Sequence, residues 1–204
     1  MLITLSFIKL KYELILASKS KVRAEVLRSI KIPFNQIAAN INEADLLNIN
    51  SADKPNNQVK DLAIAKALYV SERYPESLII GADQLVLFEG QLLGKPGNFK
   101  NTVKQLCKLQ SKEHQLLSGW TICFQNKILA SGTDSVHLKM RPMTSKLLTE
   151  YVQNEKSYDS CGGYYFESSG KLLFEQVIGS HDSLLGLPLE PILNAMWDLD
   201  LFIN

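Results

Sequence analysis

Cysteine is scarce in this chain of 204 residues, and long apolar runs are absent. The three cysteines, Cys107, Cys123 and Cys161, lack CxxC spacing and make an odd number, which argues against a zinc cage or a disulfide framework. This usage fits a reducing compartment. No apolar run approaches the roughly 20 residues that cross a bilayer, so we expect a cytoplasmic protein that does not contact a membrane.

The chain also lacks an excess of charge of either sign, because 22 Lys and Arg are balanced by 21 Asp and Glu. A formal charge of +1 supplies no field that would draw the protein to a nucleic acid, so any phosphate binding must be local. The three histidines share no metal-ligand spacing. Neither GxGxxG nor GxxxxGK[ST] occurs, which disfavours a plain doubly wound nucleotide-binding fold.

The composition that remains is that of an ordinary globular protein, with 46% hydrophobic and 21% charged residues. We expect one domain over residues 1–204, in which residues 1–12 form an N-terminal extension or an extra strand. Alternating strands and helices together with a central hairpin predict an α/β protein with a mixed sheet. Apolar patterning predicts strands at 14–17, 34–39 and 78–88, a hairpin within 114–139, and helices at 22–30, 59–73, 101–109, 145–154 and 189–198.

A polar loop between a predicted strand and a predicted helix is the first candidate site. Backbone N–H groups at the helix N-terminus, the hydroxyls of Ser18 and Ser20, and the guanidinium of Arg23 would together bind an anion. The plainer interpretation is a serine N-cap followed by solvated charges. The segment alone does not decide between the two.

Asp83 is the second candidate because it lies inside an apolar strand. A carboxylate there is either paired structurally or held for a metal or a water, since burying an unpaired charge is costly. Lys95 follows at a rigid Gly-Lys-Pro corner, where it could meet a phosphate or simply face solvent. Lys66, in an Ala-rich helix, and Glu43, in a polar loop, are weak candidates by themselves.

Five segments, taken together and in order, resemble the signatures of the Maf family of nucleotide pyrophosphatases. The agreement runs from about residue 13 to residue 196, and five ordered motifs are far more specific than any one of them. The segments are 16–20 with Arg23 (LASxSxxR in the family), 80–84 (G-[AS]-D), 94–96 (GKP), 159–167 and 179–189.

The resemblance implies a fold, a reaction and a cofactor. The fold is an elongated mixed β-sheet flanked by helices in two lobes, with the nucleotide in a central cleft, as in inosine triphosphatase. The reaction is hydrolysis of the α–β phosphoanhydride of a nucleoside triphosphate, which gives a monophosphate and pyrophosphate. A divalent cation, Mg²⁺ or Mn²⁺, is the implied cofactor, and the family also suggests a homodimer.

Roles carry over from the family residue by residue. Asp83 matches the acid that accepts a proton or activates a metal-bound water, and Glu43 matches a second carboxylate, so both are expected metal ligands. Phosphate binding is expected of Ser18, Ser20, Arg23, Lys66 and Lys95.

Base selection in the family depends on a few positions that align here with Val22, Gln84 and Glu167. Gln84 and Glu167 are similar to the branch that hydrolyses 7-methyl-GTP. Methylation at N7 makes guanine cationic, and its N1 and N2 hydrogens are donors, so a carboxylate at Glu167 complements both features. A glutamine there would suit thymine or uracil better.

The chain departs from the family pattern near its first motif. Lys21 replaces a proline, Ala24 replaces a second arginine, and Val22 stands where the 7-methyl-GTP branch often has a large aromatic. Asn42 also replaces a common aspartate. Activity is therefore expected to be lower, or the substrate shifted, unless Lys19 or Lys21 supplies the missing charge.

Two alternatives accompany this interpretation. One is a dTTP/UTP pyrophosphatase of the same family. The other is a non-enzymatic regulator of septum formation, a role linked to the family, against which the retained Asp83, Lys95 and Arg23 argue.

Overall fold

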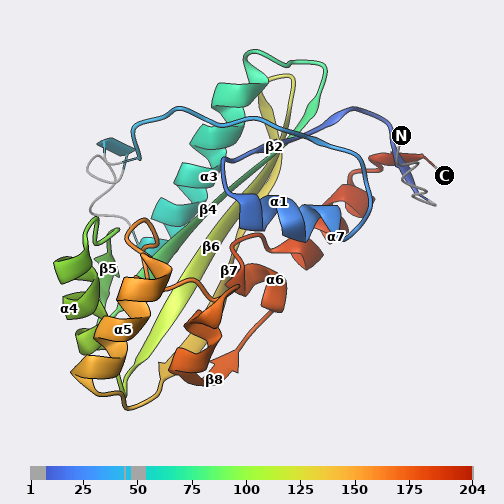
Figure 1. The fold of residues 1–204 in the computed structure, drawn as a ribbon. Coiled ribbons are helices and arrows are strands. Elements are labelled where there is room, and N and C mark those ends of the chain that lie inside the picture. Colours follow the sequence, from blue (N-terminus) through green and yellow to red (C-terminus); the bar gives the residue numbers. More distant parts are fainter. Residues whose placement is uncertain (1–7, 44, 47–53, 204) are drawn as a thin grey trace. The chain divides into compact units, whose positions relative to one another are not determined.

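The computed structural model describes residues 8–43, 45–46 and 54–203, which form a mixed sheet flanked by helices (Figure 1). The strand order of the seven-stranded sheet is β3-β2-β4-β6-β7-β8, with β5 paired to β4. β2 runs parallel to β3 and β4, whereas β5 is antiparallel to β4 and β8 to β7. The strands are β2 (Leu14–Ala17), β3 (Asn35–Gln36), β4 (Leu78–Phe88), β5 (Gln91–Leu93), β6 (Glu113–Phe124), β7 (Lys127–Met140) and β8 (Phe174–Ile178).

A separate two-stranded sheet pairs β1 (Lys9–Leu10) with β9 (Phe202–Ile203) in antiparallel register. Part of the predicted N-terminal extension is thus a strand, while residues 1–7 lie outside the described part. In that described part no helix is both long and apolar enough to cross a membrane. The helices are α1 (Lys21–Arg28), α3 (Pro55–Ser71), α4 (Phe99–Leu109), α5 (Ser145–Glu155), the 3₁₀ helix η1 (Ser169–Leu173), α6 (His181–Leu184) and α7 (Leu189–Asp198).

The chain divides into two compact units. The first contains the chain up to Gln84 together with Ser118–Asp134 and the chain from Leu185 onward, and the second contains Leu85–Leu117 and Ser135–Leu184. The chain therefore passes from one unit to the other four times, three of them inside β4, β6 and β7.

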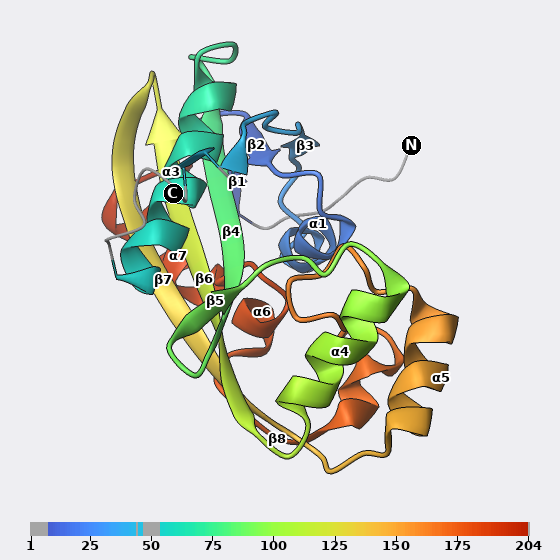
Figure 2. The same cartoon turned by 90° about the vertical axis from the view of Figure 1, so that its left-hand side faces the viewer.

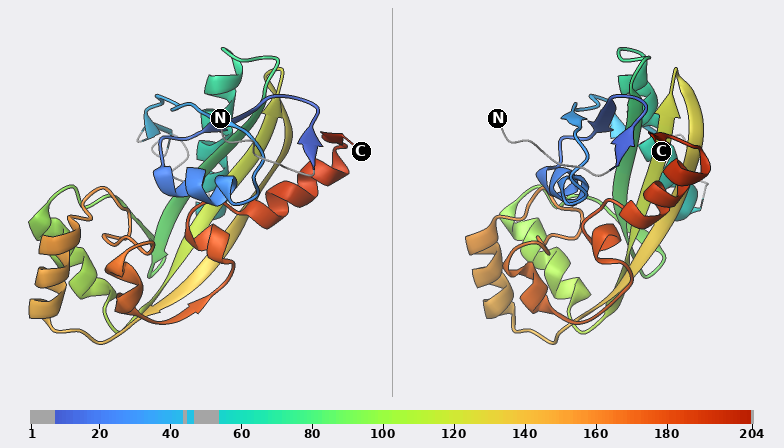
Figure 3. Two further views of the ribbon diagram at one scale, coloured as in Figure 1. Left: turned by 45° about the vertical axis from the view of Figure 1, so that its right-hand side comes forward. Right: turned by 90° about the vertical axis from the view of Figure 1, so that its right-hand side faces the viewer.

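In the first unit, helices cover both faces of the strands (Figure 2, Figure 3). Alternate residues of β2 point to opposite faces, so Leu14 and Leu16 pack with α1 and α7, whereas Ile15 and Ala17 pack with α3. α3 lies directly against the sheet at Gly81, because a Cβ there would stand 2.2 Å from the carbonyl oxygen of a residue in α3. This close approach brings the side chains of α3 to the middle of β4.

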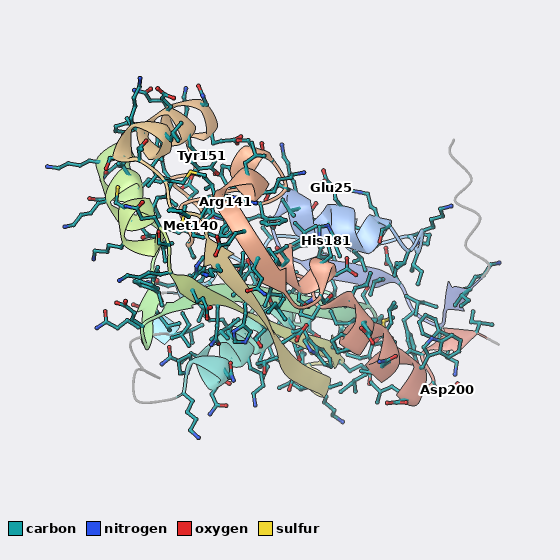
Figure 4. All side chains as sticks on the ribbon, turned by 90° about the horizontal axis from the view of Figure 1, so that it is seen from below. Glu25, Met140, Arg141, Tyr151, His181 and Asp200 are labelled. Carbon is teal, nitrogen blue, oxygen red and sulfur yellow. The ribbon has the colours of Figure 1, made fainter. Side chains whose placement is uncertain are left out.

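In the second unit, α4 and α5 lie side by side (Figure 1), and a core of aromatic and aliphatic side chains joins them to β7 and β8. Figure 4 marks Tyr151 on α5 and Met140 at the end of β7, both of which belong to this core. Tyr164 and Phe174 stack edge to face within it, with ring centroids 4.8 Å apart.

The predicted mixed sheet is confirmed, as are the strand 78–88, the central hairpin and the helix after Thr144. Thr144 caps α5 by accepting a hydrogen bond from Leu147 N at 3.3 Å. β3 is shorter than the predicted strand 34–39. α3 begins at Pro55 rather than at residue 59, since a proline in the first turn needs no N–H partner.

One titratable group in the second core makes stability depend on pH. His114 is buried; its Nε2 contacts the Tyr164 hydroxyl at 2.7 Å, and its Nδ1 has no hydrogen-bond partner among the described residues. Burial lowers the pKa of His114 from 6.5 to about 4, because desolvation disfavours the imidazolium. The unfolded chain therefore binds more protons between these values, and folding stability is present above pH 6.5 and lost as the pH falls towards 4.

We expect His114 to account for a loss of about 2 kcal/mol in the free energy of unfolding between pH 7 and pH 4.5. Urea unfolding at the two pH values measures it. His114→Phe should be less stable at pH 7, because it strands the Tyr164 hydroxyl, and it should lose this part of the pH dependence. If the variant loses as much unfolding free energy between pH 7 and pH 4.5 as the wild type does, the pH dependence belongs to other groups.

Candidate active site

A buried aspartate in the middle of β4 is the centre of the candidate site. Asp83 is 6% exposed, and its Oδ1 lies 2.6 Å from the Nζ of Lys66, which is also 6% exposed. Lys66 projects from α3, where the close packing against Gly81 brings it over the strand. The structure thus pairs a buried carboxylate with a buried ammonium, which satisfies both charges.

Lys66 also contacts a second carboxylate. Its Nζ lies 2.7 Å from Oε1 of Glu43, whose side chain is 39% exposed. One ammonium therefore bridges the two acids that the family resemblance assigns to a metal. The other oxygen of Asp83, Oδ2, has no polar partner among the residues that the structure describes.

Arg23 enters the same centre from the first turn of α1. Its Nε donates to the carbonyl of Gly186 at 2.8 Å, and its Nη1 donates to the carbonyl of Ala82 at 2.9 Å and to Oγ of Ser18 at 3.5 Å. Its Nη2 lies 3.7 Å from Oδ1 of Asp83. The structure thus brings Arg23, Lys66, Asp83 and Glu43 together.

The loop between β2 and α1 contains the predicted serine N-cap. Ser20 is the N-cap of α1 and accepts from Arg23 N at 3.3 Å, while Oγ of Ser18 accepts from Ser20 N at 3.2 Å. Gln36 holds the loop through its Nε2, which donates to the carbonyls of Ser18 and Ser20 at 2.9 and 3.1 Å. A phosphate-binding role for the two serines stays a prediction.

The position of this loop follows from strand register. Ala17, the last residue of β2, pairs with Gly81 in a parallel ladder, so the loop continues beside Ala82 and Asp83. The carboxyl ends of parallel strands are where open α/β sheets bind their ligands.

Gln84, the next residue along β4, is oriented by a buried serine. Its Nε2 donates to Oγ of Ser118 on β6 at 3.1 Å, and Ser118 is fully buried. Val22, the second predicted specificity residue, is half-buried on the first turn of α1.

Lys95 and Glu167 belong to the second unit and are both exposed. Lys95 follows β5 at the predicted corner, where Gly97 adopts a φ of +73° and its N–H donates to the carbonyl of Tyr158 at 3.0 Å. No ion pair to Lys95 occurs within the described residues. Glu167 precedes η1.

The donor set fits a hard divalent cation held partly by its substrate. Among the described residues no group of three or more His, Cys, Asp or Glu side chains could hold a metal. Mg²⁺, however, is commonly bound by one or two carboxylates together with substrate phosphates and water. Glu43 and Asp83, which both contact Nζ of Lys66 at 2.7 and 2.6 Å, are the two carboxylates of this centre that would form such a pair.

Sequence reasoning missed three participants in this centre: Ser118, Gly186 and Gln36. Each makes its contact across a long sequence separation or through a backbone atom, which no local pattern reveals. The one signal for Gly186 was its place in the family motif at 179–189.

The fold and this centre together define an enzyme of the α/β class that acts on an anionic substrate. Two carboxylates and two cations gather beside the carboxyl end of a parallel strand, with one acid oxygen left for chemistry. A structural salt bridge has no need of the second acid or of the arginine.

Comparison with known proteins identifies the family. The profile described as Maf-like protein matches residues 13–199, and the chain belongs to the Maf family. A nucleoside triphosphate pyrophosphatase of Legionella pneumophila (strain Paris) is 38% identical over 186 residues, covering 91% of this chain and 93% of that protein.

Two further relatives differ in the substrate that their names give. A 7-methyl-GTP pyrophosphatase of Bartonella quintana is 34% identical over 88% of this chain and 92% of its own length. A dTTP/UTP pyrophosphatase of Thermosipho africanus is 30% identical over 91% and 93%. A solved HAM1 protein from Coxiella burnetii aligns with a TM-score of 0.42 at 11% identity, over 90% of this chain and 98% of that one.

Proposed function

We propose that this protein, a Maf-family nucleoside triphosphate pyrophosphatase, hydrolyses 7-methyl-GTP in preference to other nucleotides. The products are 7-methyl-GMP and pyrophosphate. The proposed reaction rests on the surroundings of Asp83. This residue is buried and paired through Oδ1 to Lys66, while its Oδ2 has no polar partner among the described residues.

Asp83 accepts the proton of the water that attacks the α phosphorus. Its Oδ2 is the oxygen for this step, because Oδ1 already accepts from Lys66. Glu43 and Asp83 would hold a divalent cation, which when bound polarises the phosphoryl oxygens. Lys66 neutralises part of the charge that builds on the departing pyrophosphate, and the family resemblance assigns the same role to Lys95.

The preferred base follows from the acceptors that the chain offers. Gln84 donates through Nε2 to Ser118, and we propose that its amide oxygen accepts from the base. Guanine presents two adjacent donors, N1–H and N2–H₂, whereas thymine and uracil present a single ring N–H donor. The family resemblance assigns a base-contacting role to Glu167 as well, and a carboxylate there suits the cationic ring of 7-methylguanine.

A substrate panel tests the proposal. Pyrophosphate release is measured from 7-methyl-GTP, GTP, dTTP, UTP and CTP with Mg²⁺ or Mn²⁺. A kcat/KM for 7-methyl-GTP at least about tenfold above all others supports it, since tenfold corresponds to one well-made base contact. A preference for dTTP or UTP would keep the enzyme class and reject the substrate; no cleavage of any nucleotide would favour the non-enzymatic regulator.

Replacing Ser118 by alanine should relax base discrimination. The variant removes the hydroxyl that orients the Gln84 amide, so the ratio of kcat/KM for 7-methyl-GTP over GTP or dTTP should fall about tenfold. The matched control is Ser71→Ala, which removes another fully buried serine of the same unit that instead accepts from Asn126 N at 3.0 Å. An equal loss on every substrate would show that Ser118 only supports the fold.

A further inference from the structure

We propose that Arg23 is a positioning residue, which clamps the carbonyls of Ala82 and Gly186 and so fixes both the acid Asp83 and the base-reading Gln84. This inference rests on the proposed function for the roles of those two side chains. It differs from the family expectation that Arg23 binds the phosphates of the substrate.

The donor inventory of Arg23 supports the clamp. A guanidinium has five N–H donors in a rigid plane, and three of them point at acceptors of the protein itself. Nε bonds to Gly186 at 2.8 Å, and Nη1 bonds to Ala82 at 2.9 Å and to Ser18 at 3.5 Å. A phosphate bound through the paired Nε and Nη edge would have to break the bond to Gly186.

The two clamped carbonyls lie next to the residues that do the chemistry. Ala82 directly precedes Asp83 on β4, and Nη2 of Arg23 stands 3.7 Å from Oδ1 of that aspartate. Gly186 lies against Gln84, since a Cβ on Gly186 would be 3.6 Å from Cδ of Gln84. One planar group therefore holds β4 and the loop before α7 in register with α1.

Gly186 has the two properties that the clamp requires. Its φ is +87°, a conformation that side-chain-bearing residues rarely adopt. A Cβ at this position would also stand only 3.1 Å from Nε of Arg23 and 3.6 Å from Nη2, so the guanidinium would have to shift. Arg23 and Gly186 are thus one unit, and a change in either should have the same consequence.

The test compares catalysis with binding in Arg23→Lys, Gly186→Ala and the double variant. Lysine keeps the charge but cannot form the fork, so kcat for 7-methyl-GTP should fall about 30-fold, as expected for a small misplacement of the acid. The Kd of the non-hydrolysable α,β-methylene analogue should change by less than about threefold, because no phosphate contact is lost. Gly186→Ala should likewise lower kcat and leave the Kd of the analogue nearly unchanged. The kcat of the double variant should be no lower than that of the more affected single variant.

Lys127→Ala is the matched control, since Lys127 is an exposed cation of the same unit, at the start of β7, without an ion pair among the described residues. It should leave both kcat and Kd within about twofold of wild type. The clamp is overturned if Arg23→Lys raises the Kd of the analogue about tenfold or more while Gly186→Ala does not. If Gly186→Ala does not fold, the comparison of kcat with the Kd of the analogue in Arg23→Lys decides alone.

A separate readout distinguishes failure of the clamp from failure of the proposed function. If the wild type cleaves no nucleotide, the proposed function is wrong, and the clamp is judged by urea unfolding of the same variants. Destabilisation by Arg23→Lys and by Gly186→Ala should then be non-additive, because both break the same bonds. Additive losses would overturn the clamp whatever the activity.

Discussion

Asp83→Asn should abolish pyrophosphate release and leave the fold intact. The amide has almost the shape of the carboxylate and can still accept from Lys66 through Oδ1, so the buried contact of 2.6 Å survives. An amide cannot take a proton from water, however. We expect kcat to fall by about 10³-fold or more, the range that a positioned general base contributes.

The measurement is pyrophosphate release under saturating 7-methyl-GTP, with circular dichroism to confirm folding. Asp198→Asn, an exposed aspartate at the end of α7 in the same unit, is the control and should keep full activity. If Asp83→Asn retains more than about a tenth of the wild-type kcat, Asp83 is not the proton acceptor, since general-base catalysis contributes at least a hundredfold.

Lys66→Met should be the most destabilising single change at the site. Methionine has a similar length but no charge, so it leaves the carboxylate of Asp83, 6% exposed, with Arg23 at 3.7 Å as its remaining cation. Breaking a buried ion pair by removing one partner costs about 3 kcal/mol or more of unfolding free energy. Activity should be lost as well, because the same lysine faces both acids.

Urea unfolding measures this loss, and a double-mutant cycle identifies its cause. Lys66→Met combined with Asp83→Asn should recover most of the stability, because the stranded charge is then gone. Lys60→Met is the control on the same helix, where the lysine is half-buried and makes no ion pair among the described residues. A double variant as unstable as the sum of the single variants would contradict the buried-pair account.

Much of the fold follows from local pattern, because the apolar periodicity of each element decides which face it buries. β4 reads as an apolar run interrupted only by Asp83 and Gln84, as expected of a strand covered on both faces, and α7 begins and ends where its pattern does. β9 escaped prediction because two residues carry no period; the structure holds it by its antiparallel pairing with β1 and by Phe202, which is buried in the core of the first unit.

The charged residues of the candidate site could be predicted from the sequence, but the hydrogen bonds that hold them in place could not. Asp83 was a candidate because burying an unpaired carboxylate in an apolar strand is costly. The family resemblance added Arg23, Lys66 and Glu43. The bonds of Arg23 to Ala82 and Gly186 span 59 and 163 residues of sequence. Contacts at such separation depend on the finished topology, so no window of sequence contains them.

The interleaving of the two units has a consequence for biosynthesis. The first unit needs Ile192 and Met196 of α7 to complete the core that covers β2, and these residues are synthesised long after β2 and β4. A ribosome-bound chain that has already synthesised Asp83 and Lys66 therefore still exposes the apolar face of its parallel strands. Nascent chains should stay dependent on chaperones until α7 leaves the exit tunnel, and stop codons before residue 189 should yield aggregating fragments rather than a half-sized folded protein.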